Sequence, residues 1–357
     1  MTEKWKTADP VLAEDLEDLA AFCHAQKLSG KTFFVTGATG LIGSQICRGL
    51  LLSNKLYGDS IKVAAFVRNQ KKAEALFSDF QDGLTIVSGD IADHPDFDGN
   101  VDYIIHTASP TGSKYFVSHP VETIHAAIDG SDNMLRFARE KEVSGFVYLS
   151  SLEVYGTPDP GQKTMPETGH GYIDSTSVRS SYSEGKRIVE CLCASYASEY
   201  GLPAKIVRLA QTFGPGVRYD DGRVFADFAR CVIEKKDISL HTEGRTVRNY
   251  CYTRDAVKGI LTALLHGNTG EAYNIANPDT ACSIREMADL TASLNPDGST
   301  HVRIDIPDDI SKFGYNPEMI IRLDPSKLEA LGWKAEVGLK DMFQRLITSM
   351  ETEKNSK

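Results

Sequence analysis

The sequence predicts an α/β fold, with a doubly wound parallel sheet followed by a smaller C-terminal lobe. Up to about residue 210, short apolar runs of strand length alternate with helical patterns, which is typical of a parallel sheet. A glycine-rich segment lies directly between the first of these strands and the helix after it. Beyond residue 210 the alternation breaks into turns, prolines and short mixed elements, which indicates a separate lobe.

The predicted elements follow in chain order. Residues 10–25 carry apolar side chains at helical spacing, so we expect an amphipathic helix that packs on the domain surface or forms a dimer contact. Strands are predicted at 32–36, 61–67, 84–88, 103–107 and 145–150, with helices at 41–52, 71–80 and 121–141 between them. Right-handed crossovers between parallel strands place a ligand crevice at the carboxyl ends of the strands.

Size, charge and cysteine content restrict the class of protein. The 357 residues, 41% of them hydrophobic, can bury a large core in one large or two unequal domains. A net charge of −10 argues against general nucleic-acid binding and against attraction to an anionic membrane. Seven scattered cysteines show no paired CxxC spacing, so we expect no metal site and a reduced, cytoplasmic compartment. We expect neither a signal peptide nor a membrane span.

The glycine-rich segment predicts a Rossmann-type dinucleotide site. Gly37 permits a tight turn, Gly40 lets the backbone approach a pyrophosphate, and Gly43 lets the helix pack close to the strand. The start of that helix would face the phosphates with its partial positive charge. The cofactor contacts predicted from this segment are Gly37, Thr39, Gly40, Leu41, Ile42 and Gly43.

The end of the second strand leaves the choice of nicotinamide cofactor open. An acidic residue there would bind the adenosine ribose and favour NAD, but the strand ends at Arg68. Arg68 could pair with the 2′-phosphate of NADP, stack on adenine, or simply be solvated. After the third strand, Asp90 and Ile91 are placed to meet the adenine ring, although Asp90 could equally cap its own loop. NAD is the expected cofactor and NADP the alternative.

Tyr182 and Lys186 supply a candidate acid–base pair. They lie four positions apart on a predicted helix and therefore share one of its faces. We expect the Lys186 ammonium to lower the pKa of the Tyr182 phenol and to hold the nicotinamide ribose, so that Tyr182 can remove a hydroxyl proton. Ser151, just past the fifth strand, could bond the same oxygen. This pattern predicts redox chemistry at a sugar-like alcohol.

These motifs resemble the extended short-chain dehydrogenase/reductase family, in its nucleotide-sugar epimerase/dehydratase branch. The resemblance runs from about residue 31 to 290, and its blocks look most like UDP-glucuronate decarboxylases. It is carried by residues 36–43, 106–109, 150–156, 179–187, 212–215, 221–224 and 248–255. The resemblance implies a tightly held cofactor that is reduced and reoxidised in each cycle, further cofactor contacts from Thr107, Ala108 and Ser109, and a homodimer.

On this basis the chain divides into four parts. Residues 1–30 form an N-terminal helical extension, and residues 31–210 form the NAD(P)-binding Rossmann domain. Residues 211–350 mostly form the substrate-binding lobe, with parts that return to the Rossmann domain. Residues 351–357 are expected to be a flexible tail.

The resemblance also implies residues on the substrate side. Arg248 matches an arginine that contacts the diphosphate or the reacting sugar, and Gln211 stands where the family usually has asparagine. Arg223 and His241 match segments that line the nucleotide pocket. Surface ion pairs or strand packing are the alternative roles for these residues. Arg179 and Arg248 are both candidates to bind a substrate carboxylate.

Glu153 and Leu152 bear on the reaction. The resemblance implies that decarboxylases and 4,6-dehydratases carry glutamate at position 153, and that dehydratases carry aspartic acid at position 152 as proton donor. Leucine cannot donate a proton, so dehydration by that route is disfavoured. We expect a decarboxylase that oxidises C4 of a nucleotide sugar, with Glu153 acting near C5. The alternatives are a 4-epimerase, then a 4,6-dehydratase, and a non-catalytic NAD(P)-binding sensor.

Overall fold

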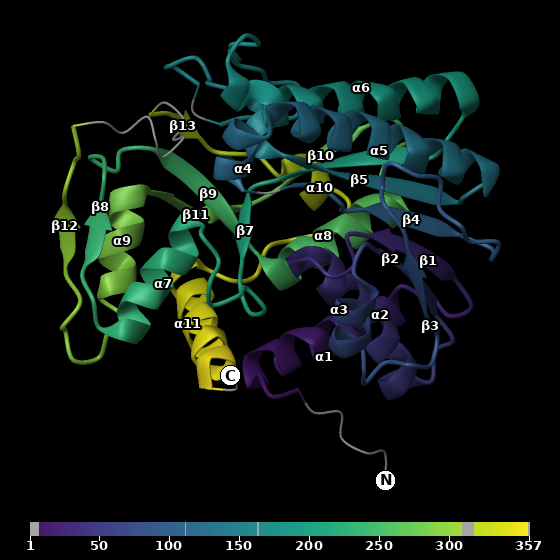
Figure 1. The fold of residues 1–357 in the computed structure, drawn as a ribbon, viewed down its shortest axis with the longest axis horizontal. Helices are drawn as coiled ribbons and strands as arrows, with labels where there is room; N and C mark the ends of the chain where they lie inside the picture. Colours follow the sequence, from purple (N-terminus) through teal and green to yellow (C-terminus); the bar gives the residue numbers. More distant parts are fainter. Residues whose placement is uncertain (1–6, 111, 163, 309–317, 356–357) are drawn as a thin grey trace.

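A seven-stranded parallel sheet dominates the computed structural model, which describes residues 7–110, 112–162, 164–308 and 318–355 (Figure 1). The strand order confirms the predicted doubly wound sheet, because successive strands run outward from β1 in both directions. From one edge to the other the strands are β10 (Ala272–Ile275), β6 (Ala204–Leu209), β5 (Gly145–Ser151), β4 (Tyr103–His106), β1 (Thr32–Thr36), β2 (Lys62–Val67) and β3 (Leu84–Ser88).

Helices cover both faces of this sheet, as Figure 1 shows. The apolar side chains of each strand alternate between two hydrophobic clusters, one on each face. One face packs against α1 (Pro10–Ala25), α2 (Leu41–Tyr57), α3 (Gln70–Leu76), α8 (Thr253–His266) and α10 (Ser326–Glu329). The other face packs against α5 (Pro120–Glu140) and α6 (Ser181–Tyr200), and α4 (Ser113–Ser118) precedes α5.

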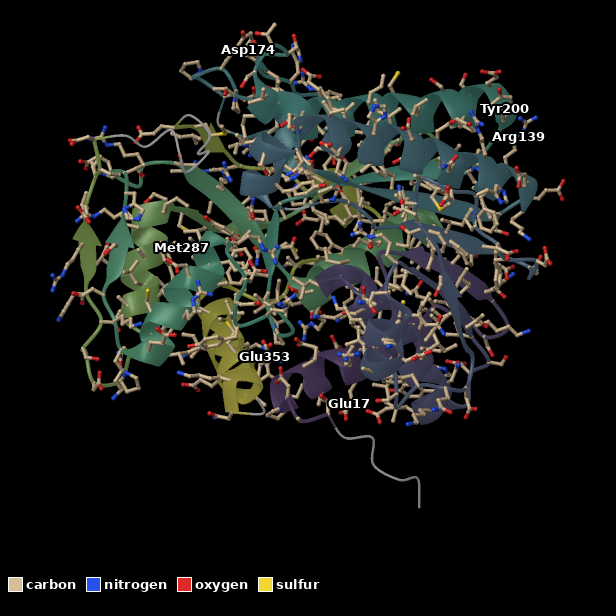
Figure 2. The ribbon with its side chains drawn as sticks, viewed as in Figure 1. Glu17, Arg139, Asp174, Tyr200, Met287 and Glu353 are labelled. Carbon is tan, nitrogen blue, oxygen red and sulfur yellow. The ribbon has the colours of Figure 1, made fainter. Side chains whose placement is uncertain are left out.

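Helices α5 and α6 lie side by side along the second face. At their far ends the Arg139 guanidinium stacks 4.0 Å above the centre of the Tyr200 ring (Figure 2). Two 3-10 helices, η1 (Leu152–Tyr155) and η2 (Val178–Ser180), stand between β5 and the start of α6. The carboxyl end of β5 therefore continues directly into a turn that faces the N-terminal end of α6.

A second, smaller lobe follows β6, and its core is a separate hydrophobic cluster. Three strands pair with β9 (Val247–Tyr252): β7 (Gln211–Phe213), β11 (Asn277–Ser283) and β13 (Ile320–Ile321). The short pair β8 (Ile238–Leu240) and β12 (Val302–Ile304) forms a further sheet, and the helices of the lobe are α7 (Val224–Glu234), α9 (Ile284–Ala292) and α11 (Leu339–Asn355). Strand β10 and helix α8 return to the first domain, as Figure 1 shows.

The C-terminal end differs from expectation. Helix α11 runs to Asn355, so residues 351–355 of the segment expected to be a flexible tail are helical. Buried Met342, Phe343, Leu346 and Met350 fix the helix on the lobe. Among the described residues, no helix is long and apolar enough to cross a lipid bilayer.

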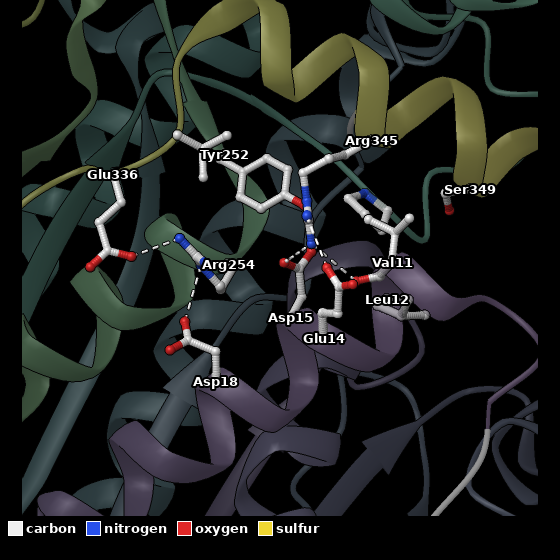
Figure 3. A network of polar contacts seen from close by, with 12 residues as sticks. Val11, Leu12, Glu14, Asp15, Asp18, Tyr252, Arg254, Glu336, Arg345 and Ser349 are labelled. Atoms are coloured by element: carbon white, nitrogen blue, oxygen red, sulfur yellow. Dashed lines mark hydrogen bonds and ion pairs between the residues drawn. The ribbon is translucent and has the colours of Figure 1, made fainter.

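Helix α1 is attached to the smaller lobe through a buried carboxylate (Figure 3). Asp15 is fully buried, and its two oxygens accept hydrogen bonds from the Tyr252 hydroxyl at 2.5 Å and from the Arg345 guanidinium at 2.9 Å. The Nε of Arg345 also donates to the Tyr252 hydroxyl at 2.6 Å. One arginine on α11 therefore serves both an N-terminal carboxylate and a tyrosine of β9.

We expect Arg345→Ala to destabilise the protein by about 2–4 kcal/mol, because it leaves the buried Asp15 charge without its cationic partner. Burial already raises the pKa of Asp15 to about 6. A folded-state pKa above the ordinary 3.8 means that Asp15 favours the folded state below pH 3.8 and loses that contribution as the pH rises through 6. The loss in free energy of unfolding caused by Arg345→Ala should therefore be larger at pH 8, where Asp15 is charged, than at pH 5.

Urea unfolding at both pH values measures this effect. Arg303→Ala is the control, because the Arg303 side chain is 71% exposed and its ion pair with Asp237 should contribute little. Equal stability of Arg345→Ala and the wild type would show that the Asp15 cluster does not anchor α1.

Candidate active site

The turn between β1 and α2 has no room for a side chain at two of its glycines. Gly37 has φ +63°, and a Cβ on it would lie 2.6 Å from the Thr107 hydroxyl. A Cβ on Gly43 would lie 2.4 Å from the Gly37 carbonyl oxygen. Gly40 caps α2 without a side-chain hydrogen bond to the first turn. The first turn of α2, with no side-chain cap, and the closely packed Gly37 and Gly43 fit a dinucleotide pyrophosphate.

The neighbouring strand end is locked to this turn by His106. The Thr36 hydroxyl lies 2.8 Å from Nδ1 of His106 and accepts hydrogen bonds from the backbone of Thr107 and Ala108. Nε2 of His106 lies 3.0 Å from the Ser131 hydroxyl on α5. Burial lowers the pKa of His106 to about 3, so its ring is neutral at physiological pH. This geometry gives His106 a structural role and places Thr107 and Ala108 beside the glycine turn.

The residues predicted for the adenosine end lie at the same edge of the sheet. Arg68 is exposed and, from the pairing of Thr36 with Phe66, follows β2 beside the glycine turn. Lys72 on α3 donates to the Thr39 carbonyl of that turn at 3.2 Å, a cation that the sequence reading did not include. Asp90 accepts a hydrogen bond from the backbone of Ala92, so one of its oxygens does cap its own loop.

Tyr182 and Lys186 lie together at the start of α6. The Tyr182 ring stacks on Phe116 of α4, with 4.3 Å between ring centres and 9° between planes. The Lys186 ammonium is buried, donates to the Leu149 carbonyl at 2.6 Å, and lies 5.7 Å from the centre of the Tyr182 ring. The same ammonium lies 4.6 Å above the Tyr148 ring. Helical spacing thus places both groups at the carboxyl end of β5, beside Ser151.

The pKa values of this pair differ from the sequence-based expectation. Burial raises the pKa of Tyr182 above its ordinary value, and the nearby Glu153 charge adds to this, while Ser151 and Arg179 lower it. Burial lowers the pKa of Lys186 to about 7, partly offset by Glu190. The expected lowering of the Tyr182 pKa is therefore wrong for this structure, because burial has the largest effect on the phenol and raises its pKa.

Glu153 and Arg179 form a bidentate ion pair beside Tyr182. Both terminal nitrogens of Arg179 lie 3.0 Å from the two carboxylate oxygens of Glu153. The Ser183 hydroxyl, which the sequence reading did not include, donates to the same carboxylate at 3.2 Å. Both charged side chains are mostly buried, with 16% and 12% of their surface exposed. Both terminal nitrogens of Arg179 are therefore bonded to Glu153 in this structure.

Ser151 and Leu152 lie next to this pair at the end of β5. The Ser151 hydroxyl accepts a hydrogen bond from the backbone of Glu153 at 3.2 Å and so caps η1. The Leu152 side chain is buried in an apolar cluster that includes Met165, Ile321 and Leu323. It packs between the two lobes, where a carboxylic acid would be buried among apolar groups.

The smaller lobe carries the remaining predicted residues. Arg248 lies on β9, and its buried Nε has no hydrogen-bond partner among the described residues. Gln211 begins β7, which pairs with β9. Arg223 instead forms a bidentate pair with Asp221, with 2.6 Å between its terminal nitrogen and the carboxylate. His241 follows β8 and bonds the Asp305 carbonyl through Nδ1.

Family membership follows from the comparison of the whole chain with known proteins. A profile described as "NAD dependent epimerase/dehydratase family" matches residues 33–276. The chain belongs to this family. The match confirms the predicted resemblance to extended short-chain dehydrogenase/reductases. The family is NAD dependent and the glycine turn fits a dinucleotide, so the expectation of an enzyme that uses NAD is confirmed as well.

Relatives within the NAD dependent epimerase/dehydratase family include several plant decarboxylases. UDP-glucuronic acid decarboxylase 3 of Arabidopsis thaliana is 32% identical over 243 residues, 68% of this chain and 67% of that protein. UDP-glucuronic acid decarboxylase 6 of the same plant is 29% identical over 326 residues, 88% of this chain and 87% of that protein.

Solved structures of other proteins share the fold. The UDP-glucose 4-epimerase of Thermotoga maritima with UDP-glucose matches with a TM-score of 0.75 and 20% identity, over 91% of this chain and 100% of that chain. The dTDP-glucose 4,6-dehydratase of Streptomyces venezuelae with NAD matches with a TM-score of 0.75 and 23% identity, over 91% and 98%. The predicted Rossmann-type architecture is thus confirmed.

Proposed function

We propose that this member of the NAD dependent epimerase/dehydratase family decarboxylates a nucleotide sugar acid, with UDP-glucuronate as the first substrate to test. The names of its plant relatives support this reading. The observation that carries it is the Glu153–Arg179 pair next to a leucine at position 152. A glutamate is available near the sugar, while the adjacent side chain is packed in the apolar cluster and has no proton to give.

In this proposal, side chains of this protein donate and accept the proton at the sugar C4 oxygen. NAD, when bound, supplies the oxidising and reducing equivalents. Tyr182 exchanges a proton with the C4 hydroxyl, and Ser151 bonds the same oxygen. Oxidation at C4 makes the substrate a β-keto acid, whose loss of carbon dioxide leaves an enolate. The Tyr182 phenol, which now holds the C4 proton, and the Ser151 hydroxyl donate hydrogen bonds to that oxyanion. C5 takes up a proton from solvent, and Tyr182 returns its own proton to the C4 oxygen when C4 is reduced.

In this proposal Arg248, rather than Arg179, binds the substrate carboxylate. The buried Nε of both arginines has no hydrogen-bond partner among the described residues, but both terminal nitrogens of Arg179 are bonded to Glu153, whereas Arg248 forms no ion pair with a described residue. An unpartnered guanidinium donor is suited to a carboxylate or a diphosphate oxygen. Gln211 and His241 are the remaining candidates for the nucleotide portion, and Arg223 would need to leave Asp221 to take part.

Mass spectrometry of products tests the proposed reaction directly. The purified protein is incubated with UDP-glucuronate and with UDP-, dTDP-, CDP- and GDP-hexoses. Loss of carbon dioxide from UDP-glucuronate supports the proposal. Loss of water would indicate a dehydratase, and a new sugar of unchanged mass a 4-epimerase. Cofactor binding with no turnover of any member of the panel would favour the sensor alternative.

Substitution of Arg68 tests whether the protein distinguishes NAD from NADP. The exposed guanidinium beside the glycine turn, with Lys72 close by, is suited to a 2′-phosphate. We expect Arg68→Asp to weaken NADP⁺ binding by about 10- to 100-fold, since a hydrogen bond to a charged group is lost and a like charge replaces it. NAD⁺ binding should stay equal or improve, because the aspartate can accept from the ribose hydroxyls.

Calorimetric titration of the cofactor-depleted protein with each dinucleotide measures this difference. Lys62→Ala is the matched control, because Lys62 is an exposed cation at the opposite end of the same strand. If Arg68→Asp changes both affinities by the same factor, Arg68 does not read the 2′-position.

The expected homodimer also remains a proposal. The outer surfaces of α5 and α6 expose large apolar side chains, with Val121 at 59% and Ile188 at 43% exposed. Burial of such side chains against a second copy of this chain is consistent with the homodimers that the resemblance implies. Sedimentation velocity of the wild type and of Ile188→Glu would decide between a dimer through this surface and a monomer.

A further inference from the structure

A buried ion pair lies directly behind the proposed catalytic residues. Glu190 of α6 and Arg208 of β6 are joined at 2.7 Å, with only 11% and 14% of their side-chain surfaces exposed. Arg208 also reaches Glu190 through its Nε, at 3.0 Å. The Ser150 hydroxyl donates at 2.5 Å to the same Glu190 oxygen that accepts from the Arg208 Nε. None of these three residues belongs to the acid–base machinery proposed above.

The pair connects the elements that carry that machinery. Ser150 precedes Ser151 in β5 and follows Leu149, whose carbonyl accepts the Lys186 hydrogen bond. Glu190 lies one helical turn after Lys186 on α6. The remaining donors of Arg208 reach the Tyr155 hydroxyl of η1 at 3.0 Å and the Glu167 carbonyl at 2.7 Å. Strand β5, turn η1 and helix α6 are therefore all fastened to one buried pair.

We propose that Glu190, paired with Arg208, is a positioning residue of the active site that holds the end of β5 against α6 and provides the counter-charge for Lys186. Its role rests on the proposed acid–base function of Tyr182 and Lys186. Without this carboxylate the ammonium would stand among aromatic and apolar groups, where its charged form is disfavoured.

The surroundings of Lys186 support a specific electrostatic role. Tyr148 and the Leu149 carbonyl face it from β5, His106 from β4, and Tyr182, Glu190 and Cys193 from α6 itself. His106 is neutral and Cys193 is a buried thiol. Burial lowers the pKa of Lys186 to about 7, and the Glu190 charge raises it. Removal of that charge therefore lowers the pKa of Lys186 further.

Glu190→Gln tests this role, because glutamine removes the charge at nearly the same size. Its amide oxygen can still accept from one donor of Arg208, and its amide nitrogen can donate to the Ser150 oxygen. For the wild type we expect NAD⁺ affinity to decline as the pH rises through about 7, where Lys186 loses its proton. In Glu190→Gln the decline should begin about one pH unit lower, which makes NAD⁺ binding near neutral pH up to tenfold weaker than in the wild type. The basic limb of the pH–turnover profile should move in the same direction.

Two further variants separate this effect from lost stability. Glu190→Asp restores the charge and should return the pH dependence toward that of the wild type. Glu190→Gln combined with Arg208→Met removes the unpaired buried guanidinium, so it serves if the single variant does not fold, and it should keep the shifted pH dependence. If the pair had only a structural role, Glu190→Gln would lower the melting temperature and weaken NAD⁺ binding equally at every pH.

The outcomes separate this proposal from the proposed function. NAD⁺ binding as a function of pH requires no nucleotide sugar, so it tests Glu190 even if no decarboxylation is found. A wild-type affinity that does not change through pH 7, or a Glu190→Gln profile superimposable on that of the wild type, would overturn the role of Glu190. Failure of the product assay alone would overturn the assigned reaction and leave this result standing.

Discussion

Tyr182→Phe is expected to lower turnover by about 10²- to 10⁴-fold, the usual contribution of a positioned general acid or base. The fold should be unaffected, because phenylalanine retains the ring that stacks on Phe116 at 4.3 Å. The variant lacks only the hydroxyl that would exchange a proton with the C4 oxygen. NAD should remain bound, since neither the glycine turn nor Lys186 is altered.

Initial rates with UDP-glucuronate, the melting temperature and the cofactor content after denaturation test this expectation together. Tyr196→Phe is the matched control. Tyr196 lies on the same helix and loses a hydroxyl that donates to Asp132 at 2.6 Å, away from β5. We expect wild-type turnover from that variant. A Tyr182→Phe protein that turns over within a few-fold of the wild type would remove Tyr182 from the mechanism.

Glu153→Gln should slow decarboxylation by about 10- to 100-fold, the loss of one or two hydrogen bonds between charged groups. The glutamine amide places donors where Arg179 also offers donors, so the bidentate pair cannot form as it does at 3.0 Å. Arg179 and the sugar-facing end of η1 then lose their fixed geometry. A 4-epimerase would need no carboxylate at this position, so its rate should hardly change.

The pH dependence provides a second readout of the same variant. The Glu153 charge raises the pKa of Tyr182, so its removal lowers that pKa. A lower phenol pKa means that the phenolate forms at lower pH, and the acidic limb of the pH–turnover profile should move toward acid. Glu184→Gln is the control, since Glu184 is nearby on α6 but pairs with Arg187 at 3.7 Å. An unchanged rate and profile for Glu153→Gln would favour the epimerase reading.

Local spacing explains why so much of the nucleotide site could be predicted. Local conformation requires two of the glycines: Gly37 has φ +63°, and a Cβ on Gly43 would lie 2.4 Å from the Gly37 carbonyl oxygen. Tyr182 and Lys186 share a helix face because they are one turn apart. The alternation of strands and helices likewise predicted all five of the strands named in the first half of the chain, to within one residue at each end.

Long-range packing decided the rest. Arg179 closes on Glu153, Leu152 enters the apolar cluster between the lobes, and Lys72 reaches the glycine turn only after the chain has folded. No local pattern in the sequence signals these contacts. The pKa of Tyr182 was misjudged for the same reason, because helical spacing shows its neighbouring cation but not the burial that dominates its environment.

The sequence by itself therefore determined the class of cofactor, the fold and the placement of Tyr182 and Lys186 on one helix face, since these depend on backbone conformation and on short periodic spacings. The tertiary structure alone decided which charges are already paired and which are unpartnered. Ion-pair partners and desolvation depend on side chains brought together from distant segments, such as Arg345 with Asp15 and Arg208 with Glu190. Those pairings distinguish the groups left available for a substrate from the groups that hold the site in place.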